Sequence, residues 1–510
     1  MLKRILVFLI CSCLIFVTAA CDTNVEDTPS ASEPEVDLFN EVHEPSVNED
    51  GTLNLPGANK YTDPSIYTID TLVAMGVEQE RTSDPEIQSK AEKLEQSILD
   101  NPDTLKPAEG GKYIYVANGG IDRRGYGLEP DKPVETIEYA HLLANEGDVI
   151  VLRRGHFWRT SVDGKKGVSY GAYGEGDKPT IYGALSNSAK KTWEKIDDNV
   201  YKVQSGTALD IGLIVFDHGK VIGTKKSSLE KLEKDYDFYS KGGYLYVYSS
   251  KGDPSKLFSD IEFCHNKYIF KLRSNSTIQN WRIMYGGGHG ISTGYVKNIK
   301  VDGCVIGYIG GSYQMEGQTV RFGNGVEVWG SCNGYTITNC HVYQCYDAGI
   351  TMQLQGETTE TWSHQNILFE NNLLELNNYN IEYFLNLARD GGSKIKNVAI
   401  KDNIIRDGGF GWGYYSRYDR NYGTNVMGVG VNVAENFVYT NNIFDNAKSM
   451  LLAISAYDAK HFPTFKGNTY ALHKDTRVLK YHGVPFANKD FGKEADIDIL
   501  GDKTAKVIFY

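Results

Sequence analysis

A short pattern of apolar and polar positions recurs along the second half of the chain. Each copy has an apolar residue, a polar residue, Asn or a substitute, one further residue and two mostly apolar positions. Six copies begin at Ile278, Val301, Ile337, Phe369, Ile400 and Tyr439. A second short β-like run follows most copies, as at 290–293 and 349–353. Such a repeat predicts a β-solenoid, in which each coil buries its inward side chains against the next.

The third position of the repeat marks the bend between strands. It carries Asn280, Asn339, Asn371 and Asn441, with Gly303 and Asp402 in the other two copies. Stacked side-chain amides hydrogen-bond along a ladder of in-register strands. We therefore expect an Asn ladder at this position, weakened but not broken at Gly303 and Asp402.

The segment 113–182 has the features of the first coils of such a solenoid. Tyr113-Ile-Tyr-Val is followed by 133–140 and then by Gly147-Asp-Val-Ile-Val-Leu. Over 113–190 and 262–455 the chain resembles the pectate-lyase-like superfamily. That resemblance implies an all-β, right-handed parallel β-helix whose open end is capped by a short helix. It does not indicate the reaction, because this superfamily hosts lyases, hydrolases, epimerases, esterases and adhesins.

Residues 191–261 interrupt the repeat with short alternating strands, which predict an inserted, sandwich-like β-rich domain. Several β-helix glycosidases are similar in carrying a β-sandwich here. We divide the chain into a signal (1–20), an acidic linker with one possible helix over 86–99 (21–111), a first β-helix part (112–190), the insert (191–261), the main β-helix (262–456) and a C-terminal cap (457–510).

The N-terminus predicts export. Lys3 and Arg4 precede an apolar stretch that is too short to span a membrane comfortably. Small residues then lead to Cys21, an arrangement that resembles a bacterial lipoprotein signal, although Thr18 stands where a large aliphatic residue is usual. The resemblance implies lipidation of Cys21 and an extracytoplasmic, membrane-anchored protein. A secretory signal cleaved after Ala20 is the alternative.

The composition of the chain limits the classes of binding partner that we expect. The net charge of −12 argues against nucleic acid and does not favour a strongly anionic polymer, although a local basic groove would override that average. The 34 tyrosines supply rings with a polar edge, which are frequent in sugar sites and on exposed sheets. Five cysteines beyond the signal, without a CxxC pair, disfavour zinc and favour free thiols or one disulfide. We expect a monomer without metal or cofactor.

Strand parity selects candidate catalytic residues, because alternate side chains face opposite sides of a strand. With Val326, Val328, Ile350, Met352, Ile381 and Tyr383 inward, two outward columns form, one of Glu327, Thr351 and Glu382 and one of Trp329, Gln353 and Phe384. Asp347 shares the outward parity where its strand begins. The backbones of Glu327 and Glu382 should lie about 10 Å apart, two coils from each other.

Three outward carboxyls within three coils suit glycoside hydrolysis, which needs a carboxylic acid and a carboxylate. We favour Glu327 and Asp347 as the catalytic pair, with Glu382 as a third member or alternative acid, and both retention and inversion stay open. The candidate substrate-binding residues are Trp329, Gln353, Phe384, Arg321, His289 and Tyr415. Arg321 is expected to orient Asp347 or Glu327, or else to act as a structural cap. His289 is either a donor to a sugar hydroxyl or a turn residue without a role. Tyr415 belongs to an aromatic patch that suits a sugar subsite and also suits plain loop packing.

Three functions remain open on these residues. The leading hypothesis is a cell-surface glycoside hydrolase acting on a polysaccharide or its oligosaccharides. A polysaccharide lyase needs Arg, Lys or a metal-bound carboxylate cluster beside a uronate, and Ca²⁺ dependence would favour it. A non-catalytic carbohydrate-binding solenoid would carry the same three acids as a solvated face. The signatures expected of alginate epimerases and polygalacturonases are absent from the sequence.

Overall fold

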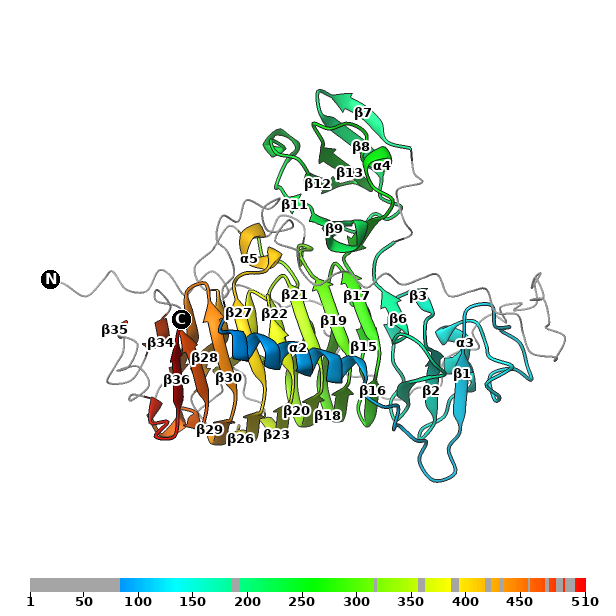
Figure 1. Cartoon of the computed structure of the whole chain (residues 1–510). Coiled ribbons are helices and arrows are strands. Elements are labelled where there is room, and N and C mark those ends of the chain that lie inside the picture. The colour runs from blue at the N-terminus through cyan, green and yellow to red at the C-terminus, as the bar shows by residue number, and fades with distance from the viewer. Residues whose placement is uncertain are drawn as a thin grey trace.

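Two long ladders of parallel strands form a β-helix that lies lengthwise in Figure 1. The computed structural model describes residues 83–185, 192–315, 319–355, 363–386, 394–417, 423–431, 434–456, 459–472, 477–482, 489–490 and 500–510. One sheet has ten strands: β3 (Phe157–Arg159), β6 (Thr180–Tyr182), β17 (Arg282–Gly286), β19 (Val305–Ile309), β21 (His341–Cys345), β24 (Leu373–Glu375), β27 (Ile404–Gly408), β30 (Ile443–Ala447), β33 (Thr469–Leu472) and β36 (Lys506–Phe509).

The other sheet has eighteen strands and winds around the remaining sides of each coil. They are β1 (Tyr113–Val116), β2 (Val149–Arg153), β4 (Val162–Asp163), β5 (Ser169–Tyr173), β15 (Phe270–Lys271), β16 (Ser276–Gln279), β18 (Ile291–Asp302), β20 (Val326–Thr338), β22 (Ala348–Gln355), β23 (Ser363–Glu370), β25 (Tyr379–Asn386), β26 (Lys394–Lys401), β28 (Thr424–Val431), β29 (Ala434–Thr440), β31 (Met450–Ala456), β32 (Thr464–Lys466), β34 (Arg477–His482) and β35 (Lys489–Asp490). Both ladders continue beyond residue 456, so the C-terminal segment extends the solenoid.

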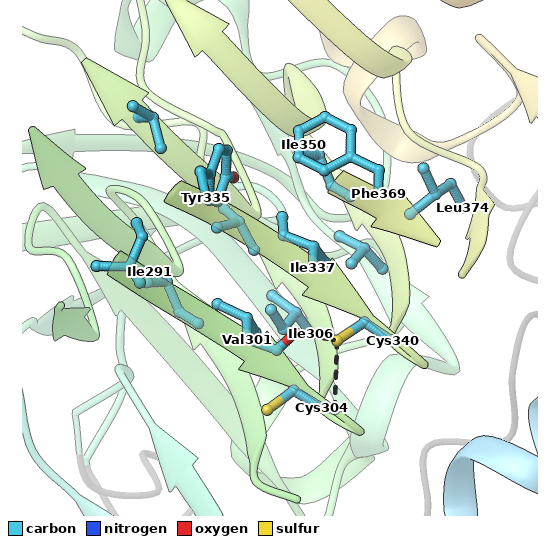
Figure 2. Packing of buried hydrophobic residues seen from close by; sticks show 14 of the residues in the cluster. Ile291, Val301, Cys304, Ile306, Tyr335, Ile337, Cys340, Ile350, Phe369 and Leu374 are labelled. Atoms are coloured by element: carbon cyan, nitrogen blue, oxygen red, sulfur yellow. Dashed lines mark hydrogen bonds between the residues drawn. The ribbon is translucent and has the colours of Figure 1, made fainter. Parts of the chain in front are cut away.

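The core consists of inward side chains stacked from coil to coil. Val301 pairs with Ile337, and Ile337 pairs with Phe369 on the next strand. Figure 2 shows these residues between the two sheets, with Ile291 and Ile306 beside them. Each inward position therefore buries one apolar side chain against its equivalents above and below, as the repeat predicts.

The main Asn ladder lies one residue after the predicted position. All six predicted bend residues have a positive φ, between 53° and 62°, a conformation that Asn, Asp and Gly adopt most easily. The buried amides that follow them form the ladder: Asn372 to Asn403 at 2.9 Å, Asn403 to Asn442 at 2.9 Å, Asn442 to Asn468 at 3.0 Å, and Asn468 to Asp502 at 2.9 Å. At the bend itself, Asn371 donates to Asn339. The bend residue thus provides the turn, and the next residue points inward and provides the bonds.

Cysteines take the place of Asn in two earlier coils. The backbone N–H of Cys304 donates to Sγ of Cys340 over 3.4 Å, which Figure 2 marks with a dashed line. All five cysteines of the described residues are buried and free. Of the two expectations, free thiols and one disulfide, the structure has the free thiols.

Two helices cover parts of the solenoid. Helix α3 (Ile137–Leu143) places Ile137 and Ala140 in the core at the start of the β-helix. Helix α2 (Pro85–Leu99) lies along the ten-stranded sheet in Figure 1 and buries Ile87, Ala91 and Ile98. Gln88 of α2 also accepts a hydrogen bond from Arg406 of β27. The linker therefore contains a segment that packs on the fold.

The insert has a core of its own and stands beside the β-helix in Figure 1. One sheet contains β7 (Glu194–Asp197), β8 (Val200–Gln204), β11 (Thr224–Lys225), β12 (Asp237–Lys241) and β13 (Tyr244–Tyr248), and the other contains β9 (Ile211–Phe216), β10 (Val221–Ile222) and β14 (Ile261–His265). A short helix, α4 (Pro254–Leu257), precedes β14. Asp210 joins the insert to the solenoid by accepting a hydrogen bond from the backbone of Tyr313.

Candidate active site

Three adjacent strands of the larger sheet, β20, β22 and β25, bring the predicted columns together. Thr351 pairs with Glu382, and Gln353 pairs with both Trp329 and Phe384. The alternate residues, Val326, Val328, Ile350, Met352, Ile381 and Tyr383, all lie in the core. Strand parity therefore predicted the direction of these side chains correctly.

The environment of Glu382 differs from the prediction. This residue is only 3% exposed, and Thr351 beside it is fully buried, so neither faces solvent. On the next strand Glu382 pairs with Met427, which belongs to a small apolar cluster on the outer face of the sheet. The cluster consists of Met427, Met450 and Ala453, with Tyr379 and Val429 packed against it. Parity indicates where a side chain points, but not what covers it.

Burial determines the charge state of Glu382. Burial raises the pKa of this carboxyl well above its usual range, and the nearby Asp347 carboxylate raises the pKa further. Arg417 and a 2.9 Å hydrogen bond from Nε2 of Gln353 act in the opposite direction. Glu382 consequently keeps its proton at a higher pH than a solvated glutamic acid does.

Asp347 is held by Arg417. Nη1 of Arg417 donates to Oδ1 of Asp347 over 2.6 Å, and the two side chains are 14% and 22% exposed. The expectation that Arg321 orients this carboxylate is wrong. Arg321 instead donates to the hydroxyl of Tyr313 and stacks over the rings of Tyr313 and Tyr346.

A short helix places Arg417. Arg417 follows α5 (Trp412–Ser416) directly, and Nε1 of Trp412 donates to the backbone oxygen of Gln344 over 2.7 Å. A Cβ on Gly413 would lie 2.5 Å from the backbone oxygen of Tyr346, so only glycine lets the helix sit this close to the solenoid. The sequence pattern did not reveal this link, because α5 follows β27 and lies two coils later than Asp347.

Glu327 is fixed by two donors. Nδ1 of His289 accepts a hydrogen bond from the backbone N–H of Asn324, so Nε2 carries the ring hydrogen of the neutral imidazole. Nε2 lies 3.1 Å from Oε1 of Glu327, and Oγ of Ser292 donates to Oε2 over 3.1 Å. His289 thus contacts the carboxylate, where a contact with a sugar hydroxyl was expected. Ser292 pairs with Glu327 across the two strands, and this pairing could have identified Ser292 as the second donor from the sequence.

The structure also places the remaining residues that the sequence predicted for substrate binding. Trp329 is 37% exposed beside the carboxyl column, and Phe384 is half-buried. Tyr415 packs edge-on against Tyr414 and lies under the ammonium group of Lys448. Cys21 lies outside the described residues.

Within the described ranges, no group of three or more His, Cys, Asp or Glu side chains is arranged to hold a metal ion. The helices in these ranges are not long and apolar enough to cross a membrane.

Comparison with known proteins agrees with the fold. A family model described as right handed beta helix region matches residues 225–359. No curated protein matches the chain in sequence.

Among solved structures, the complex of XylC with xylose has a TM-score of 0.48 at 13% identity, over 72% of this chain and 68% of that one. The lacto-N-biosidase from Eubacterium ramulus has a TM-score of 0.39 at 12% identity, over 78% and 68%. Pectate lyase Pel9A has a TM-score of 0.34 at 11% identity, over 77% and 82%. Scores this low do not bear on function.

Proposed function

We propose that this protein is a cell-surface glycoside hydrolase that acts on a polysaccharide or its oligosaccharides. The observation that carries the proposal is the contrast between two neighbouring carboxyl groups. Glu382 is buried and its pKa is raised, whereas Asp347 is paired with the guanidinium of Arg417. Glycoside hydrolysis needs this combination of one carboxylic acid and one carboxylate.

The acid is assigned to Glu382. Its proton passes to the glycosidic oxygen as the bond to the anomeric carbon breaks, which leaves Glu382 as a carboxylate. The leaving sugar departs as a neutral alcohol. This assignment revises the expectation from the sequence, in which Glu327 and Asp347 form the pair.

Asp347 is assigned as the carboxylate that completes the reaction. It either takes a proton from the attacking water or bonds to the anomeric carbon itself, and the separation of the carboxyls decides between these routes. Arg417 holds Asp347 in place through the 2.6 Å hydrogen bond. In the first route Asp347 then releases its proton to solvent and Glu382 takes one up. In the second route the Glu382 carboxylate takes a proton from water, and the resulting hydroxide breaks the bond between Asp347 and the anomeric carbon, which frees Asp347 and restores the acid form of Glu382.

Glu327 is assigned to substrate binding. Its carboxylate is held by His289 and Ser292, so its orientation is fixed before substrate arrives. Carboxylates of this kind accept hydrogen bonds from sugar hydroxyls. Trp329, two residues further along β20, offers an exposed ring for a pyranose face.

An activity screen tests the proposal. The purified protein would be offered a broad panel of glycans with and without EDTA, while reducing ends and unsaturated-uronate absorbance are followed together. We expect new reducing ends without new absorbance, and their loss in Glu382→Gln and in Asp347→Asn. Unsaturated-uronate absorbance that forms without EDTA but not with it would indicate a calcium-dependent lyase instead. Glycan retention without any product would indicate a binding solenoid.

The proposed location is the outer face of a membrane, with the lipid on Cys21 as the anchor and the acidic linker as the spacer.

A further inference from the structure

A cavity lies on the solenoid, lined by residues other than the carboxyl cluster. Its volume is about 400 Å³, and it crosses the bends of consecutive coils. Its lining includes Lys166, Ser274, Tyr295, Lys297, Ser331 and Asn333. They come from the segment before β5, the turn before β16, strand β18 and strand β20, which lie side by side. Since adjacent strands are about 4.8 Å apart, the cavity runs along the solenoid axis over more than 10 Å.

Tyr295 lies at an irregularity in the pairing of β18 with β20. Gly294 pairs with Trp329 and Val296 pairs with Cys332, so Tyr295 stands opposite two residues of β20, Gly330 and Ser331. Tyr295 has a φ of 54°. Its side chain is 58% exposed. A positive φ in a tyrosine is costly enough that the surrounding structure has to hold it.

Gly330 on the next coil makes room for this ring. Its φ is 90°, and a Cβ at this position would lie 2.8 Å from Cε2 of Tyr295. The tyrosine ring therefore lies directly on the backbone of β20. An exposed ring resting on a rigid strand is a platform on which a pyranose face can stack.

The charge of the cavity is opposite to that of the chain. Its lining includes Lys166 and Lys297 but no carboxylate, in a protein with a net charge of −12. Both lysines are exposed, and within the described ranges neither has a carboxylate partner. Hydroxyl and amide groups of Ser274, Ser331 and Asn333 complete the lining. Sugar hydroxyls and anionic substituents are the groups that such a lining binds.

We propose that the cavity at Tyr295, Lys166 and Lys297 is a binding site for an anionic oligosaccharide, one whose sugars carry carboxylate or sulfate groups. The ring of Tyr295 stacks on one sugar, and the two lysines pair with the anionic substituents. Trp329 lies on β20 between Glu327 and Ser331, so a glycan held here can continue toward the carboxyl cluster. The site is separate from that cluster, and its binding does not require that the protein hydrolyses glycans.

Calorimetric titration of the full chain with defined tetrasaccharides tests the site. The probes are tetragalacturonate, a chondroitin sulfate tetrasaccharide and neutral maltotetraose, each at low and at high salt. We expect at least one anionic probe to bind about tenfold more tightly than maltotetraose, and salt to weaken that binding. Lys166→Gln combined with Lys297→Gln should weaken it about tenfold, and so should Tyr295→Ala.

The controls separate this site from the proposed active site. Lys195→Gln combined with Lys220→Gln changes two exposed lysines of the insert and should leave binding unchanged. Glu382→Gln should also leave the affinity of this cavity for the anionic probe unchanged, whatever the substitution does to activity. Equal binding of the neutral and anionic probes, or unchanged affinity in the Lys166 and Lys297 double variant, would overturn the proposal.

Discussion

Arg417 donates a 2.6 Å hydrogen bond to Asp347 although the two residues are 70 positions apart in the sequence. The pair forms because α5 folds back from a later coil and is anchored by Trp412 on Gln344. Arg417 also lowers the pKa of Glu382, against the opposing effects of burial and of Asp347. One guanidinium thus acts on both of the proposed catalytic groups.

Replacing Arg417 should therefore change both rate and pH dependence. In Arg417→Gln, Asp347 loses its positioning partner, and we expect kcat to fall about 100-fold. The pKa of Glu382 should rise further when the positive charge is gone, so the alkaline limb of kcat/KM moves to higher pH. Steady-state kinetics across pH measure both effects. A drop in activity with an unmoved alkaline limb would contradict the link to Glu382.

Glu382→Gln should inactivate the protein and stabilise it at neutral pH. We expect activity to fall roughly 10³-fold with loss of the general acid. The raised pKa means that folded protein binds the Glu382 proton more tightly than the unfolded chain, in which the pKa is about 4.3. The stabilisation from this group is complete below that value and is lost as pH rises through the folded pKa.

Glutamine cannot ionise, so Tm of Glu382→Gln at pH 7 should exceed that of wild type by roughly 1–2 °C. The difference should vanish below about pH 4. Thermal melts at several pH values provide the measurement, with Glu435→Gln on an exposed part of β29 as the matched control. A variant that melts lower than wild type at pH 7 would show that Glu382 is ionised in the folded protein.

His289→Ala should reduce kcat/KM about tenfold, because Glu327 loses one of two hydrogen bonds that fix its orientation. Ser292→Ala removes the other donor and should have a similar or smaller effect. The matched control is His461→Ala, since His461 forms a hydrogen bond with the backbone oxygen of Ala434, outside the carboxyl cluster. Equal losses in His289→Ala and His461→Ala would point to general destabilisation rather than to positioning of Glu327.

Asn403→Ala should destabilise the β-helix by roughly 2–4 kcal/mol. The change leaves the buried amide of Asn372 and the carbonyl of Asn442 without their partner. Asn397→Gly is the control, because it removes an exposed ladder amide and keeps the positive φ. Denaturant unfolding compares the two variants, and similar losses of stability would mean that the buried ladder has no special role.

Cys21→Ser tests the proposed anchor. We expect the wild-type protein to partition into detergent and to carry a lipid-modified N-terminal peptide by mass spectrometry, and the variant to lose both properties. An unmodified Cys21 at the mature N-terminus would instead identify an ordinary secretory signal cleaved after Ala20.

The repeat and the parity of its strands were decided by the sequence alone. Inward positions such as Val301 and Ile337 must be apolar in every coil, because each stacks on its equivalent in the next, and this local rule is visible in the amino-acid pattern. The same rule placed Glu327, Thr351 and Glu382 in one column. The ladder was misplaced by one residue, since the turn residue and the residue that follows it are both Asn in two of the six copies, at 371–372 and 441–442.

The chemistry of the site was decided only by the tertiary structure. Glu382 is buried beside Met427 of the next coil, and the position of Asp347 depends on Arg417 beyond α5. The basic cavity likewise collects Lys166 and Lys297 from segments more than a hundred residues apart. Charge state and affinity depend on which groups meet across coils, and the repeat pattern does not encode the path of the loops that bring them together.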